Sequence, residues 1–68
     1  MDVDSTAISE IDYDEERAKL LVRFTSGERY VYVGVPAEVC RSFVEADSKG
    51  RFFRSQIRDR YPFNRLDS

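Results

Sequence analysis

The sequence predicts an α+β fold: a three-stranded antiparallel β-meander followed by two helices that pack together on one face of the sheet. Three observations lead to this prediction. The residues up to Val33 form runs rich in β-branched and aromatic side chains. An isolated glycine, Gly27, separates the two strongest of these runs, as in a hairpin. After Pro36, apolar residues recur at helical spacing.

The first strand is expected within residues 7–13, where apolar and polar residues alternate in part. Ile11 and Tyr13 fall on one face of an extended chain there. The acidic run Asp14-Glu15-Glu16 that follows is polar enough to form the turn into the next strand.

The second and third strands are expected at residues 17–24 and 29–33. A three-residue loop over 25–27, with Gly27 in the left-handed conformation, would join them in a hairpin with a bulge. That loop sets a register with three facing pairs: Phe24 with Glu28, Val22 with Tyr30, and Leu20 with Tyr32.

A tighter two-residue turn at Ser26-Gly27 is the alternative. It would instead pair Val22 with Val31 and Leu20 with Val33. The choice matters because a slip of one residue moves Tyr30 and Tyr32 to the opposite face of the sheet. We favour the three-residue loop, because Ser-Gly lacks the Asn or Asp that most favours the tight turn.

Two helices are expected after the strands. The first runs from Pro36, whose missing N–H costs nothing at the first helical position, to about Ala46. Its apolar stripe consists of Val39, Cys40, Phe43 and Ala46. The second helix is capped by Asp47 or Ser48 and ends where Tyr61-Pro62 forces an extended backbone. Its inward face consists of Phe52, Phe53 and Ile57.

A single domain is expected over residues 6–66, after a flexible polar tail at residues 1–5. With 41% hydrophobic residues, five Phe and four Tyr, the 68 residues hold enough core material for one folded unit. The acidic start lacks the apolar stretch of a signal peptide, and no run approaches the roughly 20 apolar residues of a membrane span. One cysteine and no histidine fit a reducing compartment, so the expected location is cytoplasmic.

The composition argues against an enzyme. No histidine can serve as the base of a Ser or Cys nucleophile, and Cys40 falls on an apolar stripe, where cysteine usually packs. The acidic residues from Asp12 to Glu16 lack the spacing of a calcium loop, and the glycines are too isolated to cradle phosphate. We therefore expect no catalytic residues, no metal, no cofactor and no small-molecule substrate.

Charge is distributed unevenly along the chain. Residues 1–47 hold five Lys or Arg and eleven Asp or Glu, a balance of −6, whereas residues 48–68 hold six and two, a balance of +4. Such an asymmetry is typical of an anion-binding surface or of internal ion pairing. The candidate RNA-binding residues are six cations and two strand tyrosines: Lys49, Arg51, Arg54, Arg58, Arg60, Arg65, Tyr30 and Tyr32.

The ordered set of motifs resembles the KTSC domain. The similarity covers Ser5 to Leu66 and rests on Tyr13-Asp14, Leu20-x-Val22-x-Phe24, Gly27, Tyr30-Val31-Tyr32, Val35-Pro36, Ser48-x-Gly50-x-Phe52-Phe53, Ile57-Arg58 and Tyr61-Pro62. That domain is named for its occurrence at the C-terminus of some lysyl-tRNA synthetases, and it also forms free-standing small bacterial proteins. The resemblance implies an α+β fold and, through the synthetase context, contact with tRNA or ribosomal RNA.

Two functions follow as hypotheses. The first is a non-enzymatic RNA-contacting module, in which arginines bind phosphate and tyrosines stack on bases. The second is a protein-interaction module that uses an open sheet edge or the charge-segregated surface. The RNA hypothesis requires an exposed tyrosine beside one continuous basic face, whereas arginines that pair internally with carboxylates favour the protein-interaction hypothesis. Tyr30 and Tyr32 could instead belong to a packed face, and the arginines could instead pair with Glu45, Asp47 and Asp59.

Overall fold

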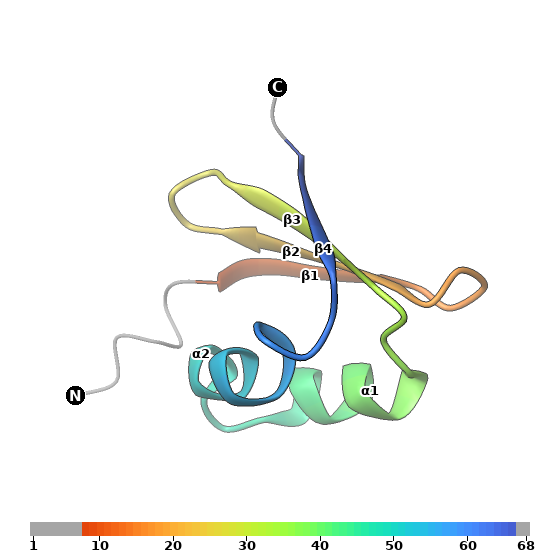
Figure 1. Ribbon diagram of the computed structural model, residues 1–68. Helices are drawn as coiled ribbons and strands as arrows, with labels where there is room; N and C mark the ends of the chain where they lie inside the picture. Colours follow the sequence, from red (N-terminus) through yellow and green to blue (C-terminus); the bar gives the residue numbers. More distant parts are fainter. Residues whose placement is uncertain (1–7, 67–68) are drawn as a thin grey trace.

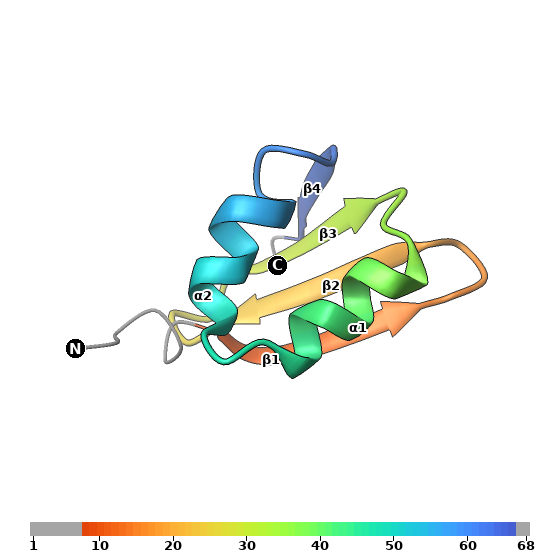
Figure 2. The ribbon, with the colours of Figure 1, turned by 90° about the horizontal axis from the view of Figure 1, so that it is seen from below.

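The computed structural model describes residues 8–66, which form one four-stranded antiparallel sheet with helices on one of its faces (Figures 1 and 2). The elements in chain order are β1 (Ile8–Asp14), β2 (Lys19–Phe24), β3 (Arg29–Val33), α1 (Ala37–Glu45), α2 (Lys49–Phe52), the π-helical segment η2 (Phe53–Ile57) and β4 (Phe63–Leu66). The predicted α+β class and the placement of both helices on one face are confirmed. The tail predicted at residues 1–5 lies outside the described residues.

The sheet differs from the prediction by a fourth strand. Its order is β1-β2-β3-β4, and β4 pairs antiparallel with β3 so that Tyr32 faces Phe63 and Tyr30 faces Arg65. The N–H of Val33 also donates to the carbonyl of Pro62 at 2.9 Å. All four residues of β4 are exposed, so the strand carries little of the apolar pattern by which strands are predicted.

The predicted hairpin register is confirmed. Leu20 faces Tyr32 and Val22 faces Tyr30. The N–H of Phe24 donates to the carbonyl of Glu28 at 2.9 Å, and Gly27 has a φ of 100°. Because only glycine adopts such a φ without strain, Gly27 sets the length of the loop and thereby the face on which both tyrosines lie.

Ala18, in the turn between β1 and β2, is hydrogen-bonded to the segment that connects β3 to α1. It has a φ of 55°, unusual for a residue with a side chain. Its carbonyl accepts hydrogen bonds from the N–H groups of Gly34 and Val35, both at 2.9 Å. The Tyr13 hydroxyl donates to the Val35 carbonyl at 2.6 Å. These three bonds fix where the chain turns from β3 into α1.

The helices begin close to their predicted positions. Pro36 is the N-cap of α1 and thus lies one residue before its predicted place. Ser48 caps α2, because its hydroxyl accepts a hydrogen bond from the N–H of Arg51 at 3.3 Å. After Phe52 the helix widens, and the N–H of Arg58 donates to the carbonyl of Phe53, five residues back, at 2.8 Å.

The core lies between the sheet and the helices. Its buried residues come from β2, β3, the β3–α1 link and the helices: Leu20, Val22, Tyr32, Val35, Cys40, Phe43, Phe53 and Ile57. Phe43 stacks on Phe52 with ring centroids 5.6 Å apart. In Figure 2, α1 lies over β1 and β2, whereas β4 lies beyond the helices. Phe63 of β4, which faces Tyr32 across the sheet, is 51% exposed, so this end of the helix-facing side is not fully covered.

Candidate nucleic-acid interface

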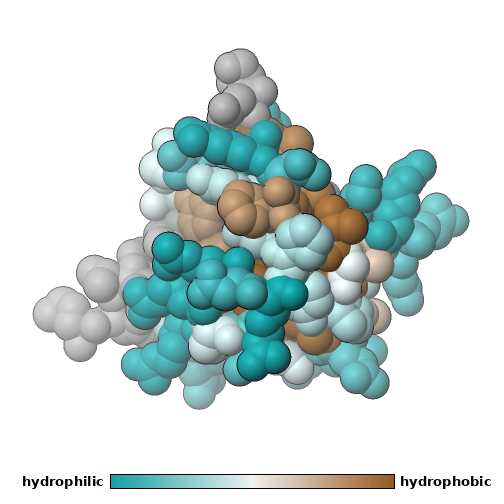
Figure 3. All heavy atoms as spheres, in the orientation of Figure 1, coloured by the Kyte–Doolittle hydropathy of each residue, from teal (hydrophilic) through white to brown (hydrophobic). Residues whose placement is uncertain are grey.

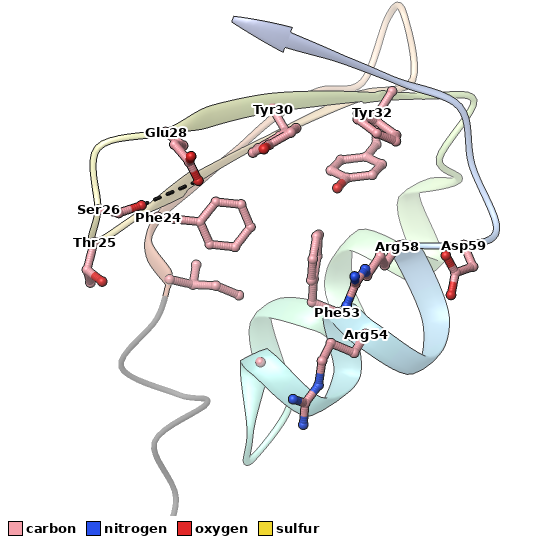
Figure 4. A pocket seen from close by; sticks show the side chains of 13 residues that line it. Phe24, Thr25, Ser26, Glu28, Tyr30, Tyr32, Phe53, Arg54, Arg58 and Asp59 are labelled. Carbon is pink, nitrogen blue, oxygen red and sulfur yellow. Dashed lines mark hydrogen bonds between the residues drawn. The ribbon is translucent and has the colours of Figure 1, made fainter. Parts of the chain in front are cut away.

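A groove of about 760 Å³ opens between the sheet and the second helix (Figure 4). We call it the aromatic groove. Its sheet side is formed by the β2–β3 hairpin and β4, and its helix side by α2, η2 and the turn after them. Its lining residues are Ile8, Phe24, Thr25, Ser26, Glu28, Tyr30, Tyr32, Gly50, Phe53, Arg54, Arg58, Asp59 and Phe63.

Five aromatic side chains in this groove contact one another in a closed circuit. Phe24 contacts Tyr30 with ring centroids 5.6 Å apart, and Tyr30 contacts Phe63 at 5.6 Å. Phe63 contacts Tyr32, and Tyr32 contacts Phe53, each at 5.4 Å. Phe53 returns to Phe24 at 5.4 Å. Most of these pairs are edge to face, the arrangement that aromatic quadrupoles favour, so the five rings support each other's positions.

The circuit has a buried floor and an exposed wall. Phe53 is 6% exposed and Tyr32 is 3% exposed, so both belong to the core. Phe63, on the edge strand, is 51% exposed. Phe24 and Tyr30 are half-buried. Aromatic surface is thus available to a ligand from β4 and from the β2–β3 hairpin.

Tyr32 is a core residue, whereas Tyr30 is partly exposed. Tyr32 packs in the core with Leu20, opposite it on β2. Burial raises the pKa of Tyr32 to about 12, and the nearby charge of Arg58 opposes part of this rise. Tyr30 lies farther along β3 and remains half-buried beside the groove. Tyr30 packs against Phe24 and Phe63, and it is the more accessible of the two tyrosines.

Two predicted cations line the aromatic groove from the helix side. Arg54 and Arg58 are exposed, and in Figure 4 Arg58 lies between Phe53 and Asp59 while Arg54 lies farther along the helix. The two arginines are four residues apart: Arg54 lies in η2 and Arg58 directly follows it. The structure therefore brings two cations and the two predicted tyrosines to one site.

The other four predicted cations do not line this groove. Arg65 forms an ion pair with Glu28, its guanidinium 3.3 Å from the carboxylate. Arg60 lines a smaller pocket of about 340 Å³, where Glu38 of α1 also lies. The ammonium of Lys49 donates to the carbonyl of Ala46 at 3.5 Å, and Arg51 is exposed. The predicted cationic residues are thus divided over more than one surface.

Sequence reasoning did not assign Phe24, Phe63, Asp59 or Glu28 to the site. Phe63 joins it through β4, which was not predicted, and Phe24 through its ring contact with Phe53. Figure 3 shows apolar surface in the middle of this face between hydrophilic side chains. No local sequence signal marks β4, because all four of its residues are exposed.

The acidic turn after β1 and Cys40 do not line the aromatic groove. Within residues 8–66 no three potential ligand side chains gather to hold a metal ion. The acidic turn is held by Arg17, whose backbone N–H donates to Asp14 and keeps the pKa of that carboxyl below its usual value. Cys40 is buried, which raises the pKa of its thiol. No helix in this part of the chain has the length and apolar character needed to cross a membrane.

Comparison with known proteins points to one family. The KTSC domain model matches residues 4–61. An uncharacterised protein of Stutzerimonas stutzeri is 39% identical over 64 residues, covering 93% of this chain and 90% of that protein. A lysine–tRNA ligase of Nostoc punctiforme is 30% identical over 63 residues, which are 93% of this chain and 11% of the ligase.

A solved structure is also similar. The crystal structure of a KTSC domain protein from Yersinia pestis matches with a TM-score of 0.86 and 34% sequence identity. The match covers 98% of this chain and 94% of that chain. The whole arrangement of sheet and helices is therefore shared.

Proposed function

The chain belongs to the KTSC domain family, and we propose that it is a small non-enzymatic module of the cytoplasm that contacts RNA, from tRNA or the ribosome, through the aromatic groove. The observation that carries the proposal is the position of Arg58 and Arg54 beside exposed aromatic surface. Guanidinium groups bind phosphate in a bidentate manner, and unpaired bases stack on aromatic rings. The groove offers both kinds of contact at one place.

The composition of the groove supports RNA over a purely electrostatic anion site. A site that only neutralises phosphate needs cations, whereas here five aromatic rings line the same hollow. Within a chain of net charge −2, strong binding through charge alone is not expected. Stacking has to contribute to affinity. A related segment in a protein named lysine–tRNA ligase agrees with an RNA ligand.

The proposal is tested by an amide NMR titration of the labelled chain with short single-stranded RNA and with tRNA, at low and at moderate salt. We expect shifts centred on β3, β4 and residues 50–59, weaker at higher salt. Arg58→Glu should abolish them. The matched control is Arg41→Glu, which makes the same charge change at an exposed helical arginine that does not line the groove. Unchanged spectra with both RNAs at low salt would refute RNA binding.

A protein-interaction role is the second candidate, and the edge strand favours it. β4 has one neighbour, β3, and exposes Phe63 and Leu66, the latter 39% exposed. An extended segment of a partner, such as β4 of a second copy, could hydrogen-bond to the other side of this strand. Sedimentation velocity over a wide range of concentrations tests self-pairing. A sedimentation coefficient that does not change with concentration would exclude it.

A further inference from the structure

The size of the aromatic groove exceeds what a phosphate contact requires. Its volume of about 760 Å³ lies within the range of roughly 300–1,000 Å³ in which protein pockets hold small organic groups. A planar ring could occupy it. The question is therefore which kind of ring the lining residues suit.

The walls favour stacking. Phe63 is 51% exposed on one wall, Tyr30 and Phe24 are half-buried beside it, and Phe53 closes the floor. Because Phe63 contacts both Tyr30 and Tyr32, its ring is held in place before any ligand arrives. A ring that is already ordered loses little conformational entropy on binding. Base–aromatic stacking contacts have this arrangement in proteins that bind single-stranded nucleic acids.

The charges disfavour a cationic guest. Aromatic cages for cations surround an ammonium with ring faces and carboxylates. Here the carboxylate on the sheet side, Glu28, is paired with Arg65 at 3.3 Å, and its other oxygen accepts from the Ser26 hydroxyl at 3.5 Å. On the helix side, two arginines, Arg54 and Arg58, line the groove together with one carboxylate, Asp59, which lies beyond Arg58 in Figure 4. A neutral ring that carries an anionic group fits this balance better than a cation does.

The π-helical segment positions the cations relative to the floor. A widened turn is rare, and such turns occur frequently at functional sites. Here Phe53 and Ile57 are buried in the core, while Arg54 and Arg58, each one residue further along the chain, lie at the groove. One hydrogen bond of 2.8 Å, from the Arg58 N–H to the Phe53 carbonyl, connects the residue at the groove floor to the proposed phosphate-binding cation.

We propose that the aromatic groove holds one unpaired base of single-stranded RNA, stacked against Phe63 and Tyr30, with the adjoining phosphate on Arg58. This rests on the proposed function and specifies which part of the RNA is recognised. The Asp59 carboxylate at the same end of the groove is an acceptor for amino groups on the edge of the base.

The test compares two labelled oligoribonucleotides of equal length, one intact and one whose nucleotides are abasic, by fluorescence anisotropy with the full chain. Both carry the same phosphates, so they differ only in the bases. We expect the abasic strand to bind about five- to a hundredfold more weakly. Phe63→Ala should bring the two affinities together.

The matched control is Leu66→Ala. It also removes an exposed apolar side chain from β4, but Leu66 is three residues from Phe63 and therefore lies on the other face of the sheet. Leu66→Ala should preserve the preference for the intact strand. Phe63→Leu keeps an apolar residue without the aromatic ring, so loss of the preference in this variant as well separates stacking from the stability of β4.

The outcomes are distinct. Equal affinity for the two strands would overturn the base-binding inference and leave RNA binding intact. A preference for the intact strand that persists in Phe63→Ala would place the base elsewhere. No binding of either strand would refute the proposed function together with this inference.

Discussion

Tyr32 lies on the boundary between the core and the aromatic groove. Its ring contacts Phe53 beneath it and Phe63 beside it, each with centroids 5.4 Å apart, and it is 3% exposed. The same residue thus carries stability and shapes the site. A substitution that keeps the ring but removes the hydroxyl can separate the two contributions.

Tyr32→Phe should change the pH dependence of stability above pH 10. The pKa of the Tyr32 phenol is raised from 10.0 to about 12 in the folded chain, so its stabilising contribution is present below pH 10 and is lost as the pH rises toward 12. The loss amounts to about 2 kcal/mol, less than the full shift implies because the residue borders the groove. Urea unfolding at pH 9 and pH 11.5 measures it. An identical pH dependence in Tyr32→Phe would contradict this assignment.

Phe43→Ala should be among the most damaging single changes. Phe43 is fully buried and stacks on Phe52, so its removal leaves a cavity that costs about 3–5 kcal/mol, a large part of the total stability of a small domain. Thermal unfolding followed by circular dichroism measures the effect. The neighbouring Val44 is 49% exposed, and Val44→Ala, the control, should change stability by no more than about 0.5 kcal/mol. Comparable losses in the two variants would contradict the packing.

At the scale of the elements, the β2–β3 hairpin determines which side chains reach the groove. Its three-residue loop places Tyr30 and Tyr32 opposite Val22 and Leu20, on the face that the helices partly cover. A shorter loop would turn both tyrosines to the other face. The hairpin is held at this length by the left-handed conformation of Gly27.

Gly27→Ala should therefore destabilise the fold through conformation alone. A Cβ at this position would meet nothing within 4 Å, so there is no steric clash. The φ of 100° remains unfavourable for alanine, and we expect a loss of about 1–2 kcal/mol in urea unfolding. Ser26→Ala, in the same exposed loop, is the control and should lose at most about 0.5 kcal/mol. Full stability in Gly27→Ala would mean that the loop has another conformation available.

The elements also show why sequence reasoning succeeded for one part of the site and failed for another. The hairpin could be predicted because its signals are local: Gly27 and the alternation on either side of it. β4 could not, because its four residues are exposed and its partner β3 lies about thirty positions earlier in the chain. The widened turn at Phe53 could not be predicted either, because Phe53 and Ile57, four residues apart, share one face in an ordinary α-helix too, and their spacing does not distinguish the two.

For the whole molecule, the uneven charge along the chain becomes a separation in space. The acidic strand β1, with Glu10, Asp12 and Asp14, is one edge of the sheet, and β4 is the opposite edge. Figure 2 shows these strands at the two ends of the order β1-β2-β3-β4. The aromatic groove is lined from β4 at one end, but Ile8 at the start of β1 and the carboxylates of Glu28 and Asp59 line it as well. The sequence predicted the asymmetry, but the division of the six cations over separate surfaces required the fold.

The salt dependence of RNA binding should consequently be shallow. If Arg54 and Arg58 supply the phosphate contacts, the slope of log Kobs against log salt is roughly −1.4, since each phosphate contact in a single strand contributes about −0.7. All six predicted cations acting together would give about −4. Anisotropy titrations at several salt concentrations measure the slope. A value near −4 would show that the contact surface extends well beyond the groove.

The exposed fourth strand has a consequence for local stability. Within residues 8–66, none of the buried core residues comes from β4, so we expect opening of β4 from β3 to cost less free energy than unfolding of the core, even though it would uncover Tyr32, which Phe63 contacts. Such a partial opening carries Phe63 away and removes one wall of the aromatic groove. A ligand that stacks on Phe63 binds only the closed form, so it draws the strand back onto the sheet. If the groove binds a base, base binding and the pairing of β4 with β3 form one coupled equilibrium, in which the edge of β3 is withdrawn from pairing with another chain when the base is bound.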